Sequence, residues 1–139
     1  MYLIDTNVIS EIRKQSRSNE GVKRFFKVAS LQNNKLFLSV ITIGELRRGI
    51  EMIRYRGDLE QADSLEKWLH IVVQSYAANI LDFTVTEAQV WGKLRAPHHQ
   101  NAIDKQIAAT ALTYDLVLVT RNIKDFADTG VQLINPWES

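Results

Sequence analysis

The chain has 139 residues, near the usual size of one domain, and is long enough to bury one substantial core. Hydrophobic residues make up 45% and charged residues 24%, which excludes a disordered chain. Cysteine is absent, which excludes a disulfide scaffold, a thiolate zinc site and a cysteine nucleophile. The net charge of +1 leaves the type of partner open, because local patches decide nucleic-acid binding.

The sequence predicts a single domain without a membrane segment. Its apolar runs are far shorter than the roughly 18 residues of a membrane span. Residues 1–5 lack the basic region and the apolar stretch of a signal peptide. Because there is no repeat or linker, we expect residues 1–139 to form one domain in the cytoplasm.

Short apolar runs alternate with helical patterns along the chain. In chain order the predicted elements are a strand at 2–4, a helix at 21–29, a strand at 36–39, a helix from Thr42, a helix at 59–73, a strand at 80–83, a helix ending at Leu94, a helix at 103–114, a strand at 116–120, a helical turn at 123–126 and a strand at 131–134. Thr6 is positioned to cap a helix after the first strand.

This alternation predicts an α/β fold in which helices cover both faces of a parallel sheet. In such sheets, ligands bind outside the carboxyl ends of the strands. Acidic residues that directly follow strands are therefore the first candidates for a functional site.

Four acidic residues lie where predicted strands end or helices begin. Asp5 ends the first strand, and Glu45 lies in the first turn after the second. Asp104 starts a helix, and Asp125 follows the clearest strand. The order of the elements brings these carboxylates to one edge of one sheet.

Helix capping is a structural explanation for the same residues. Thr42-x-x-Glu45 matches a capping box, and Asn101-x-x-Asp104 and Asn122-x-x-Asp125 are looser forms of it. Acidic side chains in a first turn also offset the helix dipole. The pattern leaves capping and function equally supported for Glu45, and it favours capping for Asp125.

Capping explains Asp5 and Asp104 less well. Asp104 precedes Ile107, Ala108 and Ala111 by three, four and seven residues, which puts it beside the buried stripe of its helix. Asp5 ends a strand that we expect to be central, where a charge is rare without a partner. Capping of the following helix remains the alternative for Asp5.

Carboxylates crowded at one sheet edge repel one another, which raises their pKa values and destabilises the fold. A hard cation removes that repulsion, and oxygen ligands suit Mg²⁺ or Mn²⁺. Such a site could activate water and neutralise charge that develops on a phosphodiester. A nucleic-acid substrate would therefore require a metal here.

Five segments of the chain, taken in order, resemble the motifs of a known protein family. They are Asp5-Thr-Asn, Glu45-Leu with Gly49-Ile50, Asp104-x-x-Ile107-Ala-Ala-Thr-Ala, Val119-Thr-Arg-Asn-x-x-Asp125-Phe and Gly130-Val-Gln-Leu-Ile-Asn-Pro-Trp137. Each is a weak signal alone. In this order and spacing they resemble the PIN-domain ribonucleases, and the last segment is similar to the VapC/FitB toxin branch.

The resemblance implies a single-domain α/β/α sandwich with a parallel sheet of about five strands. It also implies hydrolysis of RNA phosphodiesters that depends on Mg²⁺ or Mn²⁺. The residues it assigns are Asp5, Glu45, Asp104 and Asp125 as catalytic and metal-binding acids, and Thr6, Thr120 and Asn122 as supporting residues. Family members differ at the fourth acidic position, so Asn122 is the alternative to Asp125 there.

The resemblance further implies a toxin of a type II toxin–antitoxin pair that cuts tRNA, rRNA or mRNA. A VapB-like antitoxin would block the site, and the toxin would form a homodimer. Residues 45–56 mix apolar and basic side chains and could dock the antitoxin, although a solvated basic helix face is the favoured explanation. Arg13, Lys14 and Arg17 offer a second basic cluster for RNA phosphates.

The loop before Asp104 departs from the family pattern. It carries Pro97, His98 and His99 where many relatives are rich in glycine. The histidines could act as general acids or contact RNA, but an exposed polar loop is favoured. Lys105 could contact phosphate, but a solvated helix residue is favoured.

Two other functions fit parts of the pattern. A phospho-accepting signalling domain has similar size and α/β order, but it needs paired acids after the first strand. Here Asp5 is followed by Thr6 and Asn7, and Thr120 by Arg121 where a lysine would be needed. A PIN domain that binds RNA or a partner without cutting is the other alternative.

Overall fold

A parallel sheet of five short strands, in the order β3-β2-β1-β4-β5, is the centre of the computed structural model, which describes residues 1–138. The strands are β1 (Tyr2–Ile4), β2 (Leu36–Ser39), β3 (Ile80–Leu81), β4 (Val117–Val119) and β5 (Leu133–Ile134). All the pairings are parallel, and Leu3 lies between Phe37 of β2 and Leu118 of β4. The predicted α/β class with a parallel sheet is confirmed.

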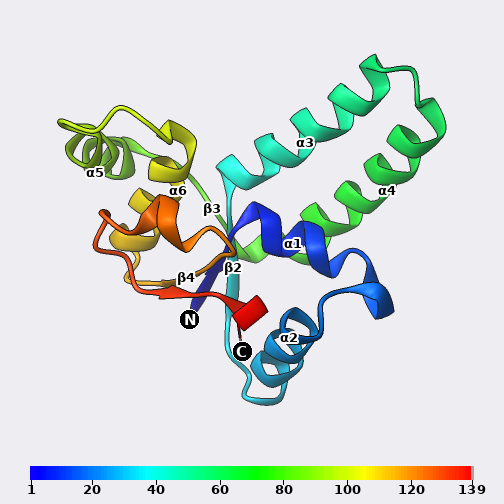
Figure 1. Cartoon of the computed structure of the whole chain (residues 1–139), viewed down its shortest axis with the longest axis horizontal. Helices are drawn as coiled ribbons and strands as arrows, with labels where there is room; N and C mark the ends of the chain where they lie inside the picture. The colour runs from blue at the N-terminus through cyan, green and yellow to red at the C-terminus, as the bar shows by residue number, and fades with distance from the viewer. Residues whose placement is uncertain (139) are drawn as a thin grey trace.

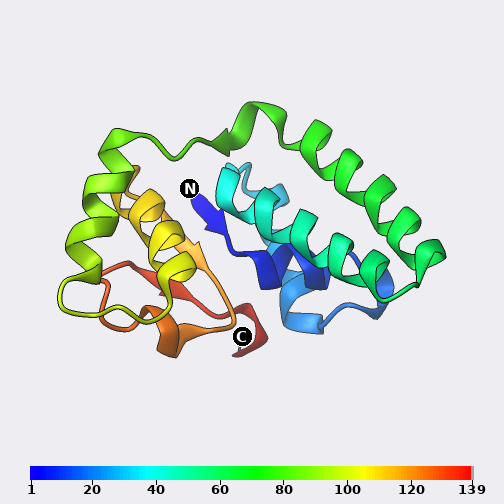
Figure 2. The same cartoon turned by 90° about the horizontal axis from the view of Figure 1, so that it is seen from above.

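Helices lie on both faces of the sheet (Figures 1 and 2). They are α1 (Thr6–Ile12), α2 (Glu20–Leu31), α3 (Val40–Tyr55), α4 (Leu59–Ser75), α5 (Val85–Arg95) and α6 (Ala102–Thr113). Short 3-10 turns are η1 (Gln15–Arg17), η2 (Ala77–Asn79), η3 (Ile123–Phe126) and η4 (Pro136–Glu138). Figure 2 shows α1 to α4 on one side and the pair α5–α6 on the other.

Alternation along β1 divides the core into two layers, because successive side chains of a strand point to opposite faces. Ile4 packs with Val8, Val22 and Leu38 on the side of α1 to α4. Leu3 packs with a second group on the side of α6, made of Ile107, Ala108, Ala111, Leu116, Leu118 and Phe126. Both β1 residues are fully buried, which makes β1 the central strand that the sequence predicts.

The predicted elements are confirmed in kind, and their ends differ. The outer strands are shorter than predicted: β3 stops at Leu81 rather than residue 83, and β5 begins at Leu133 rather than residue 131. An outermost strand has one neighbour only, so few of its residues are held by a ladder. The helix predicted from Thr42 begins at Val40, directly after β2.

The first helix cap also differs from the prediction. Asp5 caps α1 with its side chain, and Thr6 is the first residue of that helix. Aspartate accepts hydrogen bonds from backbone N–H groups at a helix start at least as well as threonine. The hydroxyl of Thr6 is thereby available for contacts with other elements.

The core predicts a large cost for truncating Leu38, which is fully buried in β2. Leu38→Ala is expected to lower the free energy of unfolding by about 2–5 kcal/mol, because it removes apolar contacts and leaves a cavity. Urea unfolding measures this change. Leu31→Ala, at a leucine that is 74% exposed, serves as the control, and an equal loss there would contradict the assignment of the core.

Candidate active site

Asp5 lies at the carboxyl end of the central strand, and only 3% of its surface is exposed. Its Oδ1 accepts a hydrogen bond from the backbone N–H of Thr6 at 2.8 Å. Its Oδ2 accepts one at 2.7 Å from the hydroxyl of Thr120, which follows the neighbouring strand β4. Helix capping therefore accounts for one carboxylate oxygen of Asp5. The other oxygen is bound at the carboxyl end of the neighbouring strand, β4.

Burial raises the pKa of Asp5 to about 6. The hydrogen bonds from Thr120 and Thr6 lower this pKa, and the negative charges of Glu45 and Asp125 raise it. The ionised form of Asp5 is thus disfavoured in the fold, and a nearby positive charge would stabilise it.

Glu45 reaches the site from α3 through the hydroxyl of Thr6. The Thr6 hydroxyl donates to Glu45 Oε1 at 2.7 Å and lies 3.1 Å from the Thr42 hydroxyl. The predicted capping box of Thr42 and Glu45 is wrong, because Ser39 caps this helix by accepting from the N–H of Ile41 at 3.0 Å. Thr42 lies inside α3, fully buried, and supports Thr6.

Asp104 lies in the first turn of α6, half-buried, beside the apolar face predicted for it. Burial raises its pKa to about 6, and the negative charges of Asp5, Asp125 and Glu45 add to that shift. The predicted side-chain cap by Asn101 does not form: Asn101 is left-handed, with φ 57°, and its side chain makes no capping hydrogen bond.

Asp125 comes from the turn η3 after β4. The Asn122 side chain makes no capping bond there, so the looser capping pattern is again not formed. Instead the N–H of Asn122 donates to the Thr120 hydroxyl at 3.0 Å, which joins the turn to the partner of Asp5. The charge of Asp125 acts on both Asp5 and Asp104, so the four acids share one electrostatic site.

Asn7 is a site residue that the sequence reasoning missed. Its Nδ2 lies 3.5 Å from both Asp5 Oδ2 and the Thr120 hydroxyl, and its Oδ1 accepts from the N–H of Arg121 at 3.2 Å. The signal was its place in the Asp5-Thr-Asn segment, two residues after the acid.

The loop before α6 lies outside this hydrogen-bond network. His98 Nε2 is 3.9 Å from Asp128 Oδ2, and the His99 carbonyl accepts from Arg95 at 3.0 Å. Both histidines are exposed, in agreement with a polar surface loop. The expectation of a solvated Lys105 is wrong: it is 2% exposed, and its ammonium donates to the Gln100 carbonyl at 3.0 Å, which ties α6 to this loop.

The donor set of the site fits a hard divalent cation. Within residues 1–138, no three acidic or histidine side chains stand close enough together to surround an ion by themselves. Mg²⁺ typically binds through one or two carboxylates and keeps several waters. Asp5 and Asp104, two neighbouring carboxylates with raised pKa values, match that number of protein ligands.

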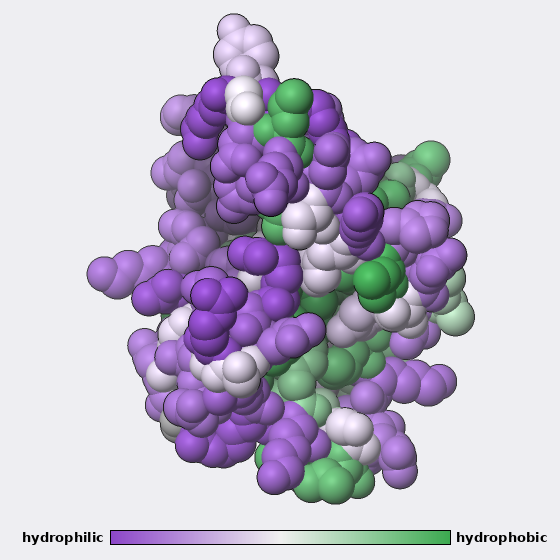
Figure 3. Space-filling view, turned by 90° about the vertical axis from the view of Figure 1, so that its right-hand side faces the viewer, coloured by the Kyte–Doolittle hydropathy of each residue, from purple (hydrophilic) through white to green (hydrophobic). Residues whose placement is uncertain are grey.

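An apolar pocket of about 210 Å³ begins beside the acids and runs between α1, α3 and α4. Its lining includes Thr6, Glu45, Arg13, Leu46, Ile50 and Trp68. Arg13 lies over the Trp68 ring, 6.0 Å from its centre. Figure 3 shows that this side of the molecule is mainly hydrophilic, with hydrophobic side chains gathered near its middle.

The basic residues predicted to bind partners have partly structural roles. Arg47 and Arg54 both pair with Glu66, at 2.8 and 2.9 Å, and so connect α3 to α4. Lys14 pairs with Glu11 at 3.0 Å. A solvated basic face on α3 is therefore only part of the explanation, because two of its arginines hold the helix pair together.

Comparison with known proteins identifies a family. A family model described as PIN domain matches residues 2–131. The chain is 34% identical over 143 residues to toxin FitB of Neisseria gonorrhoeae, covering 99% of each chain. It is 29% identical over 146 residues to VapC ribonuclease Y4jK of Sinorhizobium fredii, covering 99% of each. The crystal structure of FitAcB from N. gonorrhoeae superposes with a TM-score of 0.81 at 31% identity over the whole of both chains.

The raised pKa of Asp5 predicts a pH-dependent stability difference. An acid with a folded pKa above its unfolded value stabilises the fold at low pH, and that contribution is lost as the pH rises from about 4 to about 6. In EDTA at pH 7.5, the free energy of unfolding of Asp5→Asn is therefore expected to exceed that of the wild type by up to about 3 kcal/mol. The variant should unfold at a higher urea concentration. The advantage should vanish near pH 4.

Exposed Asp82→Asn is the matched control and should show no such pH-dependent difference. Urea titrations at several pH values between 4 and 8 measure it. A mutant at Asp5 that is less stable than the wild type at every pH would contradict the burial of an uncompensated charge.

Proposed function

The chain belongs to the PIN-domain family, and on that basis we propose that it is a ribonuclease that depends on Mg²⁺ or Mn²⁺ and acts as the toxin of a VapBC-like toxin–antitoxin pair. Family membership confirms the resemblance and removes the signalling-domain alternative. One relative is named a VapC ribonuclease and another a toxin, and both names support the proposal. A location in the cytoplasm, where an RNA substrate would be met, is part of the same proposal. No helix within residues 1–138 is long and apolar enough to cross a membrane.

One observation carries the proposal: four carboxylates from different elements lie near enough to one another at the carboxyl edge of the sheet for their charges to interact. Asp5 and Asp104 have raised pKa values, and Glu45 and Asp125 act on both through their charge. A purely structural cluster would be paired with basic side chains. Here the hydrogen bonds to Asp5 and Glu45 come from hydroxyl, amide and backbone groups, so charge neutralisation is left to a cation.

The residues of this chain hold the acids in place for that cation. Thr120 and Asn7 orient Oδ2 of Asp5, and Thr6 orients Glu45. Asp5 and Asp104 are the proposed main metal ligands, with Glu45 and Asp125 completing the acidic site and Asn122 as the alternative fourth residue. The bound ion would supply positive charge that stabilises the transition state of phosphodiester hydrolysis.

The proposed antitoxin would use the apolar pocket between α1, α3 and α4. The pocket joins apolar lining, suited to a partner side chain, to Glu45 of the acidic site. A chain bound there would cover the acids and exclude RNA. A homodimer is a further part of the proposal. Light scattering on the purified protein, which measures its molar mass in solution, tests it.

The proposal predicts metal-dependent cutting of RNA. Purified protein is expected to cut pooled tRNA and rRNA into discrete fragments with Mg²⁺ or Mn²⁺, and EDTA should abolish the cutting. Asp5→Asn and Asp104→Asn are each expected to reduce the rate by about 10²-fold or more, the scale of losing a main source of charge stabilisation. Gel analysis of labelled fragments measures the rates.

Exposed Asp82→Asn should cut like the wild type, and circular dichroism should show that all variants are folded. Cutting that survives Asp104→Asn would contradict the site. RNA bound but never cut would favour the non-catalytic PIN domain.

A further inference from the structure

A second pocket, lined mostly by polar and charged residues, includes Asp125 of the acidic site. Its volume is about 440 Å³, within the roughly 300–1,000 Å³ range of ligand sites. Six of its lining residues are Arg121, Asn122, Lys124, Asp125, Asn135 and Glu138. Because Asp125 borders both the pocket and the acids, a polymer bound at the acids would extend into this pocket.

The pocket contains a ready stacking surface. The Arg121 guanidinium lies over the Trp137 ring, 5.1 Å from its centre, and the arginine is exposed. Trp137 packs on the core beneath it, and the backbone N–H of Trp137 donates to Asn135 Oδ1 at 3.0 Å. A planar group that lies on an aromatic ring is suited to stacking with a nucleic-acid base. In single-stranded RNA, bases stack on aromatic rings or on arginine guanidinium groups.

The hydrogen-bond network fixes this surface relative to the acids. The N–H of Arg121 donates to Asn7 Oδ1 at 3.2 Å, and the N–H of Asn122 donates to the Thr120 hydroxyl at 3.0 Å. Asn7 and Thr120 both contact Asp5. The backbone at Arg121 is thus tied to the residues that contact Asp5, and the Trp137 ring lies beneath its guanidinium.

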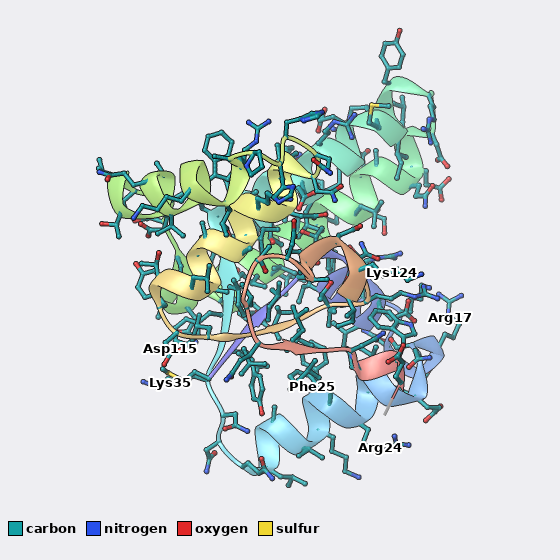
Figure 4. All side chains as sticks on the ribbon, turned by 60° about the vertical axis from the view of Figure 1, so that its left-hand side comes forward. Arg17, Arg24, Phe25, Lys35, Asp115 and Lys124 are labelled. Carbon is teal, nitrogen blue, oxygen red and sulfur yellow. The ribbon has the colours of Figure 1, made fainter. Side chains whose placement is uncertain are left out.

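The charge of the acidic site makes a neighbouring cation necessary. Four carboxylates repel the phosphates on either side of the scissile bond, even when an ion neutralises part of their charge. Lys124 and Arg121 bring positive charge to the pocket beside Asp125. Figure 4 shows Lys124 and Arg17 on the same side of the molecule, next to the C-terminal segment, and Lys35 on the opposite side.

We propose that this pocket is a strand subsite that holds single-stranded RNA next to the acidic site. A base stacks on the outer face of Arg121, and the adjoining phosphate contacts Lys124. Asn135 and Glu138 offer hydrogen-bonding groups to the edge of the base. This inference rests on the proposed ribonuclease function and adds the residues, Arg121 and Lys124, that hold the strand beside the acids.

Binding of a short labelled RNA, as a single strand and as a duplex of the same sequence, tests the subsite. The background is Asp104→Asn, so that the RNA stays intact, and anisotropy measures the affinity. Arg121→Lys keeps the charge but removes the planar stacking group, and it is expected to weaken single-strand binding by about tenfold, with duplex binding unchanged. Lys124→Ala should weaken both, with a salt slope smaller by about 1.

Lys35→Ala is the matched control, at an exposed basic residue on the opposite side of the molecule, and it should bind like the background protein. Unchanged single-strand affinity in Arg121→Lys and Lys124→Ala, while the wild type still cuts RNA, would overturn the subsite and leave the ribonuclease proposal standing. If the pocket binds an acidic peptide instead of RNA, the two variants would likewise keep the single-strand affinity of the background protein. An absence of both cutting and RNA binding would overturn both proposals.

Discussion

The hydrogen bonds to the buried Asp5 carboxylate are the constraint on which the rest of the site depends. One oxygen is held by the backbone of the helix that Asp5 caps, and the other by the Thr120 hydroxyl from the neighbouring strand end. A carboxylate in this position is too desolvated to ionise easily, and its pKa of about 6 reflects that cost. The surrounding hydroxyl and amide groups orient the charge without neutralising it, so the site is arranged for an added cation.

Two arginines line pockets that border this centre. Arg13 stacks on Trp68 on one side, and Arg121 stacks on Trp137 on the other. Both arginines are held over aromatic rings, which fixes a long side chain at the rim of the acids and lowers the entropy lost when a ligand binds.

The sequence alone predicted the sheet, the four acids and their common edge, because strand-end positions follow from the alternation of apolar runs. The sequence could not predict which hydroxyl group forms a hydrogen bond with which partner. Thr42 looked like a helix cap, but the chain turns into α3 directly at Ser39, so Thr42 is buried. Lys105 looked solvated, but the loop before α6 folds over it, and the carbonyl that binds it comes from an irregular segment. Asn7 was missed because it contacts Thr120 and Arg121, which follow β4 far along the chain.

The order of the strands links the site to the completeness of the polypeptide. β1 pairs first with β2, but its other neighbour is β4, and the bond from Thr120 to Asp5 spans 115 residues of sequence. A nascent chain that has left the ribosome only as far as α4 carries Asp5 and Glu45 yet lacks Asp104, Thr120 and Asp125. The fold thus assembles its centre only when the last third of the chain is available, and an unfinished chain presents an open sheet edge with half of the acids.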